Sequence, residues 1–232
     1  MQSATYRSLS RVPLLGIVLF TAMPALAQRQ DEQFWFQANT NVPLAKDFRV
    51  TLEQIARFGD RQGGLYQSEV GALFGYRVAP GVEFGAGYRY VGMHNGNTAR
   101  DEHRLRQQVI ISRGRFTTRF RVDERFHPEG DEIGFRIRPL VRYNHPLSAD
   151  RRLALFISHE SFIMPNRTKW GQARGYDRMR NIVGLVLPVS REVSADIGYL
   201  NQYRPGRHGG RSQMDHALSI QLTINLKAVP KI

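Results

Sequence analysis

The sequence contains no cysteine among its 232 residues. This absence excludes thiol catalysis, disulfide cross-links and thiolate metal sites. Histidine is sparse too, with seven residues, and no histidine pair stands beside a carboxylate at a compact ligand spacing. We therefore expect neither a metal ion nor a cofactor, and we expect the fold to depend on its own backbone hydrogen bonds and packing.

Lysine is scarce as well, and arginine supplies most of the 33 basic residues that give the formal net charge of +13. The few lysines are Lys46, Lys169, Lys227 and Lys231. In a cytosolic protein this excess of arginine would indicate nucleic-acid binding. The first residues of the chain argue for a different location.

Long apolar runs are limited to one, from Leu14 to Phe20, which follows Arg7 and Arg11 and precedes a group of small residues ending at Ala27. This pattern is typical of a cleavable secretory signal, and the run is shorter than the roughly 20 residues that a membrane-spanning helix needs. We expect a signal peptide at 1–27 and one domain at 28–232. Export excludes nucleic acid and leaves lipopolysaccharide phosphates, or the chain's own carboxylates, as partners for arginine.

Beyond the signal, apolar and polar residues alternate with period two, which predicts β-strands with one apolar and one polar face. The clearest run is Leu218 to Leu226, where every second residue is leucine or isoleucine. Several of the runs match the roughly 9–11 residues that a tilted strand needs to cross a bilayer. The candidate strands lie near 33–40, 47–58, 65–78, 81–91, 102–112, 115–126, 132–144, 152–163, 175–188, 192–203 and 214–226.

These strands predict an all-β fold, an antiparallel up-and-down transmembrane β-barrel in the bacterial outer membrane. Short connections at 79–81, 113–114 and 188–190 alternate with longer ones, as expected for periplasmic turns and outer loops. Single-chain bacterial barrels close with an even number of strands, so we expect 10 or 12 strands. The expected partners are outer-membrane lipid, lipopolysaccharide and the barrel-assembly machinery, and the oligomeric state stays open.

The same alternation fits a soluble periplasmic barrel that binds an apolar ligand. Two features favour the membrane barrel: the tyrosines lie mostly toward strand ends, as in an interfacial girdle, and charges recur on the opposite face.

Several short motifs recur in order along the chain: Phe34-Trp35-Phe36, Leu52-Glu53-Gln54, Arg57-Phe58, Gly87-Tyr88-Arg89-Tyr90, Glu102-His103-Arg104, His159-Glu160-Ser161-Phe162 and Arg180-Asn181 before Gly184. With these motifs the sequence resembles a bacterial family catalogued as domain of unknown function 2490, over about residues 33–226. The resemblance implies an exported barrel and brings no agreed activity.

The polar face predicts a barrel lumen filled by arginines and carboxylates that pair with one another. Such a lumen favours a non-enzymatic protein that is structural, binds a partner, or forms a narrow anion-preferring channel. The residues predicted to form this network are Glu53, Arg104, Arg106, Arg119, Arg121, Asp123, Arg136, Arg138, Glu160, Arg178 and Arg180.

An alternative is a lipid esterase or acyl hydrolase. His159 and Ser161 are two residues apart on one predicted strand, so both project from the same face, toward lipid. If the next connection is roughly symmetric, Asn181 lies near His159 and orients the imidazole, which completes a nucleophile, base and orienting group. This arrangement resembles that of an outer-membrane phospholipase.

Two predicted outer loops are rich in arginine and offer contacts to lipopolysaccharide phosphates. Solvated loops would show the same charges, because exposed charges alone specify no partner. The loop residues predicted to make these contacts are Arg167, Lys169, Arg174, Arg204, Arg207 and Arg211.

Overall fold

The structure is a computed structural model that describes residues 28–97, 99–150, 152–207 and 209–227, so the predicted signal peptide lies outside the described residues. No helix in these ranges is long and apolar enough to cross a membrane. The described elements are β1 (Arg29–Ala45), β2 (Phe48–Gly59), the 3-10 helix η1 (Asp60–Gln62), β3 (Gly64–Ala79), β4 (Val82–Met93), β5 (Glu102–Arg113), β6 (Phe116–His127), β7 (Gly130–Pro146), β8 (Ala154–Met164), β9 (Gly175–Pro188), β10 (Val193–Arg204) and β11 (Gln213–Asn225).

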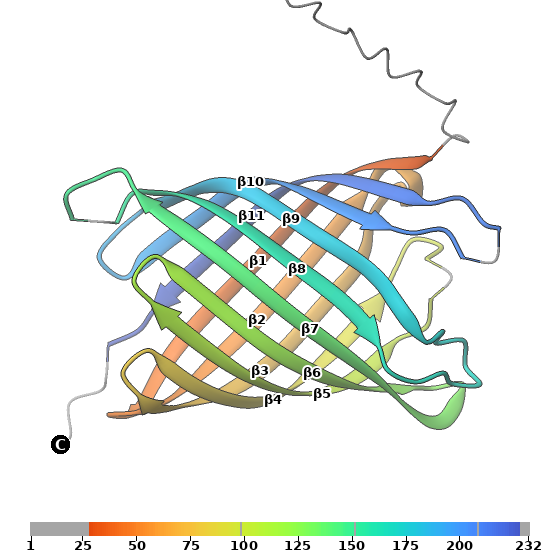
Figure 1. Cartoon of the computed structure of the whole chain (residues 1–232), viewed down its shortest axis with the longest axis horizontal. Helices are drawn as coiled ribbons and strands as arrows, with labels where there is room; N and C mark the ends of the chain where they lie inside the picture. The colour runs from red at the N-terminus through yellow and green to blue at the C-terminus, as the bar shows by residue number, and fades with distance from the viewer. Residues whose placement is uncertain (1–27, 98, 151, 208, 228–232) are drawn as a thin grey trace, which may run out of the picture.

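The strands form one closed barrel in which every strand pairs with its neighbours in sequence, and β1 pairs with β11 (Figure 1). The predicted all-β barrel is confirmed. The predicted count of 10 or 12 is wrong, because the described residues form 11 strands. An up-and-down chain with an odd strand number leaves its first and last strands pointing the same way. Here a parallel ladder from Arg29–Gln213 to Asn41–Asn225 closes the barrel, whereas the prediction assumed antiparallel closure.

The two ends of the barrel differ. The longest connections, 94–101, 165–174 and 205–212, share one end with the start of β1, which we call the loop end. The turns at 46–47, 80–81 and 114–115 lie at the other end, the turn end, together with the end of β11. Gly81 and Gly114 adopt φ of 76° and 61° in these turns, a conformation that glycine adopts without steric cost.

The outer face of the barrel is apolar and the inner face is charged. Phe84, Phe120 and Ile157 project outward with 50%, 52% and 52% of their surface exposed. Arg106 and Asp123 point inward and are 1% and 0% exposed. The charged interior is the reverse of a soluble barrel, and the apolar side chains inside, such as Trp35, Leu73 and Leu200, lie among arginines and carboxylates.

Candidate functional site

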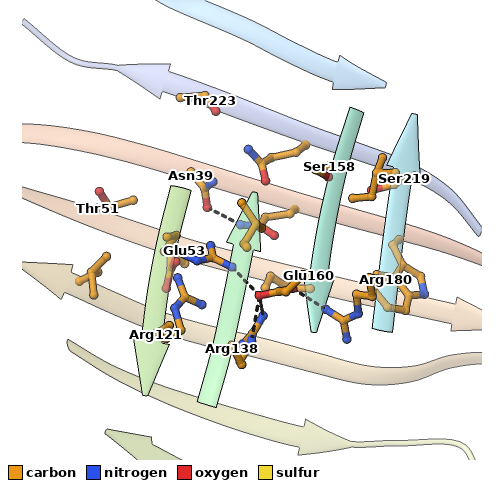
Figure 2. A pocket seen from close by; sticks show the side chains of 18 of the residues that line it. Asn39, Thr51, Glu53, Arg121, Arg138, Ser158, Glu160, Arg180, Ser219 and Thr223 are labelled. Carbon is orange, nitrogen blue, oxygen red and sulfur yellow. Dashed lines mark hydrogen bonds and ion pairs between the residues drawn. The ribbon is translucent and has the colours of Figure 1, made fainter. Parts of the chain in front are cut away.

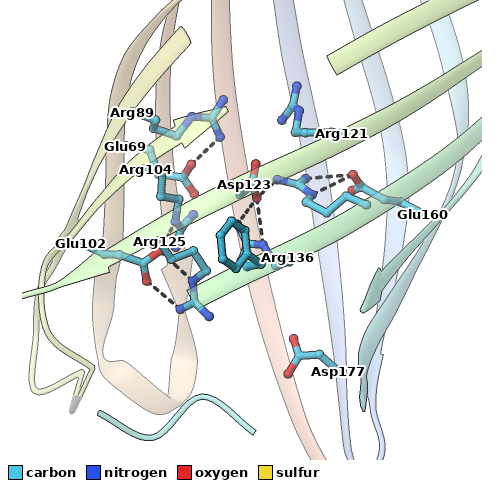
Figure 3. Close-up of polar contacts among 12 residues, drawn as sticks. Glu69, Arg89, Glu102, Arg104, Arg121, Asp123, Arg125, Arg136, Glu160 and Asp177 are labelled. Carbon is cyan, nitrogen blue, oxygen red and sulfur yellow. Dashed lines mark hydrogen bonds and ion pairs between the residues drawn. The ribbon is translucent and has the colours of Figure 1, made fainter. Parts of the chain in front are cut away.

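The centre of the barrel is filled by ion pairs in which each carboxylate contacts more than one arginine (Figure 3). Asp123 lies 2.5 Å from Arg136 and 3.4 Å from Arg138. Glu160 lies 2.5 Å from Arg119 and 2.9 Å from Arg138. Because Arg138 bridges the two carboxylates, the adjacent strands β6, β7 and β8 are linked by side chains on the inner face as well as by the backbone hydrogen bonds of the sheet.

A second group of ion pairs continues the network toward β2 to β5. Arg89 bridges Glu53 at 2.8 Å and Glu69 at 2.5 Å, and Arg106 also pairs with Glu53. Pairing of this kind lets the charges be buried, since an isolated buried charge is strongly unfavourable.

All of the predicted network residues face the interior, either buried or lining its cavities. Arg178 pairs with the neighbouring Asp177 at 2.5 Å, and Arg180 packs over the rings of Trp35 and Phe162. The prediction left out Arg57, Arg89 and Arg125, which belong to the network and occupy the same alternating positions.

Two cavities enter the lumen from opposite ends. A cavity of about 370 Å³ opens from the turn-end side (Figure 2), and one of about 460 Å³ lies toward the loop end. Both are lined by Arg57, Arg89, Arg138 and Arg180. Arg121, only 5% exposed, also lines the turn-end cavity, and its guanidinium donates to Gln108 at 2.9 and 2.6 Å.

A separate polar site lies on the outer face. His159 on β8 and Asn181 on β9 are direct register partners, and His159 Nδ1 lies 2.7 Å from Asn181 Oδ1. The other ring nitrogen, Nε2, lies 3.0 Å from Ser161 Oγ. In the tautomer that carries its proton on Nδ1, the imidazole donates to Asn181 and accepts from the Ser161 hydroxyl, which is the geometry of a nucleophile, base and orienting group.

Tyr176 joins this outer site although the sequence did not indicate it. Its hydroxyl lies 3.4 Å from Ser161 Oγ. A register shift in the β8–β9 pairing at Phe162 and Ile163 places Tyr176 opposite Ile163. The shift is a β-bulge or similar irregularity, and such features change the direction of side chains near functional sites. The period-two alternation of the sequence does not indicate where they occur. Arg207 holds the segment by donating to the backbone oxygen of Tyr176 at 2.7 Å.

The predicted lipopolysaccharide-contact residues separate into two groups. Arg167, Lys169, Arg174 and Arg211 are exposed at the loop end. Arg204 and Arg207 instead line the loop-end cavity, where Arg204 lies 3.6 Å from Asp215 and Arg207 lies 3.9 Å from Asp177. In the residues that the structure describes, no group of three or more histidine and acidic side chains is placed to hold a metal ion.

The fold and these sites define a closed β-barrel with a charged lumen, an apolar outer face and a serine, histidine and asparagine cluster on that face. The chain belongs to the family described as "Protein of unknown function (DUF2490)", which matches residues 32–213. The resemblance inferred from the sequence is thereby confirmed.

Similar known proteins include a relative by sequence and a solved structure. An uncharacterised protein of Methylorubrum extorquens is 31% identical over 202 residues, a match covering 84% of this chain and 88% of that protein. A solved structure described as "Unveiling the Mechanism Behind the in-meso Crystallization of Membrane Proteins" has a TM-score of 0.42 and 14% identity, and the match covers 79% of each chain.

Proposed function

We propose that the barrel spans the bacterial outer membrane and hydrolyses acyl esters of membrane lipids with Ser161, His159 and Asn181. Membrane insertion is supported by the apolar outer face, where Phe74, Phe84 and Leu218 are each about half exposed, at 48%, 50% and 51%. Water would solvate such a continuous apolar surface poorly, whereas lipid chains cover it without cost.

Membrane insertion predicts a specific fractionation result. The protein should remain in the outer-membrane pellet after alkaline carbonate extraction and should migrate faster in detergent gels when it is not heated, because the closed barrel stays folded in detergent. Cell fractionation followed by gels of heated and unheated samples checks this result. Recovery in the soluble periplasmic fraction would contradict it.

Hydrolysis is supported above all by one observation, the continuous hydrogen-bonded chain Asn181–His159–Ser161 on the lipid-facing side. These three side chains lie on the outer surface of the barrel. A need to pair buried polar groups therefore does not account for their hydrogen bonds. Ser161 is three residues from the loop end of β8, about 10 Å along the strand. An ester near the membrane surface, with water available for the second step, would lie at this depth.

The proposed reaction follows from the roles of these groups. Ser161 Oγ attacks the ester carbonyl carbon while His159 Nε2 takes the hydroxyl proton, and Asn181 keeps the ring in the correct tautomer. The Tyr176 hydroxyl is placed to donate a hydrogen bond to the oxyanion of the tetrahedral intermediate. The ester C–O bond then breaks, and the proton on Nε2 passes to the leaving alcohol. A water molecule, deprotonated by His159 Nε2, then attacks the carbonyl carbon of the acyl group on Ser161. The bond from this carbon to Ser161 Oγ breaks, Oγ takes the proton from Nε2, and the fatty acid leaves.

The basic residues at the loop end suit an anionic lipid substrate. Arg167, Lys169 and Arg174 are exposed in the connection between β8 and β9, the two strands that carry Ser161 and Asn181. Guanidinium and ammonium groups there would pair with the phosphates of a lipid head group, including those of lipopolysaccharide. Release of free fatty acid from phospholipid and lipid A by the purified, detergent-folded barrel tests the proposal, and no release from either lipid would exclude it.

A narrow anion-preferring pathway through the lumen is a second candidate function. It is supported by the four arginines that line both the turn-end and the loop-end cavities, Arg57, Arg89, Arg138 and Arg180.

If the lumen conducts, replacing Arg119 and Arg121 with glutamine should weaken anion preference, because both positive charges line the turn-end cavity. Reversal potentials in planar bilayers under a salt gradient measure this preference. Unchanged selectivity in the double variant would contradict an anion pathway past these residues.

A further inference from the structure

An apolar hollow of about 450 Å³ lies on the outer face beside the proposed catalytic group. His159 and Asn181 form part of its rim, and the rest of its lining is mainly aromatic and aliphatic. Val183 lies at its centre, with Ile157 of β8 and Tyr199 of β10 as its register partners on either side.

The hollow has a direction relative to the barrel. It extends from His159 toward the turn end, where the rings of Phe116 and Tyr143 lie 5.0 Å apart. In a lipid of the outer leaflet, the acyl chains likewise run from the surface toward the bilayer centre. An ester at Ser161 would therefore place its acyl chain along the hollow and its head group toward the basic loop end.

A second apolar hollow lies on the outer face but carries no candidate catalytic group. It measures about 570 Å³ and is lined by residues of β2 to β6, including Phe74, Phe84 and Ala86. Its lining contains no serine or histidine, so it has no nucleophile to which an acyl ester could be presented. The hollow at Val183 differs because its rim holds the imidazole hydrogen-bonded to Ser161.

We propose that the hollow around Val183 is the acyl-chain site of the enzyme and makes it selective for long-chain esters of outer-leaflet lipids. The inference rests on the proposed hydrolase function. Burial of the chain against aliphatic and aromatic side chains supplies binding free energy that a short-chain ester lacks, and it holds the carbonyl carbon next to Ser161 Oγ.

The test fills the hollow and compares esters of different chain length. Val183→Trp places a large ring where the chain would lie, and Ala86→Trp makes a similar change in the second hollow as a matched control. p-Nitrophenyl butyrate and p-nitrophenyl palmitate, both in detergent micelles, carry the same leaving group. We expect Val183→Trp to lower kcat/KM for the palmitate by about tenfold or more, while the butyrate value stays within about twofold. Ala86→Trp should change neither value.

The outcomes distinguish this inference from the proposed function. Equal effects of Val183→Trp on both esters, or none on the palmitate, would overturn the acyl-chain site while leaving hydrolysis intact. If the wild type hydrolyses neither ester and releases no fatty acid from phospholipid or lipid A, the hydrolase proposal fails. The acyl-chain site is then tested separately by cross-linking with a photoreactive long-chain fatty acid. We expect this probe to label Ile157, Val183 and Tyr199 in the wild type, and we expect Val183→Trp to reduce the labelling. Labelling spread evenly around the barrel would reject the site.

Discussion

Replacing Ser161 with alanine should lower the rate of lipid ester hydrolysis by about 10³-fold or more. The expected loss is large because the serine, histidine and asparagine act as one unit, and removal of the nucleophile leaves only binding and oxyanion stabilisation. The Ser161 hydroxyl makes its hydrogen bonds on the outer surface, with His159 and Tyr176, and not in the barrel interior. Folding should therefore be unchanged, as judged by heat-modifiable migration. Fatty-acid release under saturating substrate measures the effect on kcat.

A serine inside the barrel supplies the matched control. Ser219 on β11 lines the turn-end cavity and takes no part in the outer hollow or the catalytic group. Ser219→Ala should leave hydrolysis unchanged, and Asn181→Ala should lower it less than Ser161→Ala, because the orienting group costs less to remove than the nucleophile. Full hydrolysis by Ser161→Ala would exclude this cluster as the catalytic group.

Replacing Asp123 with asparagine should destabilise the folded barrel by about 3–5 kcal/mol. Asp123 is 0% exposed and is the carboxylate between Arg136 and Arg138. Loss of its charge leaves Arg136 buried without its acidic partner, while Arg138 keeps Glu160. Urea unfolding of the barrel in detergent micelles or lipid vesicles, followed by tryptophan fluorescence, measures the free energy of unfolding.

An exposed ion pair provides the comparison. Arg100 and Glu129 are 2.8 Å apart, with side chains that are 67% and 54% exposed. Exposed pairs contribute about 0–1 kcal/mol, so Glu129→Gln should shift the unfolding midpoint far less than Asp123→Asn. Similar midpoints for the two variants would show that the central network does not stabilise the fold.

The positions of the strands along the chain can be predicted from the local sequence. Period-two alternation located every strand, and the observed bounds of β5, β9 and β11 (102–113, 175–188 and 213–225) lie within one residue of the predicted ranges. The alternation is visible in the sequence because each strand has one apolar and one charged face, and successive residues point to opposite faces. The residues before and after a position therefore indicate which face of the sheet it occupies. The same signal placed the predicted arginines and carboxylates in the interior.

Strand number and closure could not be read in this way. The run at 33–40 is only part of β1, since Gln30 to Glu32 and Asn39 to Pro43 are polar or mixed and hide the rest of the strand. Whether β1 meets β11 in parallel depends on the whole circuit of the sheet, which no local pattern contains.

The sequence by itself determined the β-strand class, the two faces of the sheet and the pairing of His159 with Ser161, because these depend on residues that are neighbours along one strand. The tertiary structure decided the parallel closure with 11 strands, the partner of each buried charge, the distance from His159 to Asn181, and the position of Tyr176 after the register shift. These features depend on strand register, and register is a property of the closed sheet rather than of any single segment.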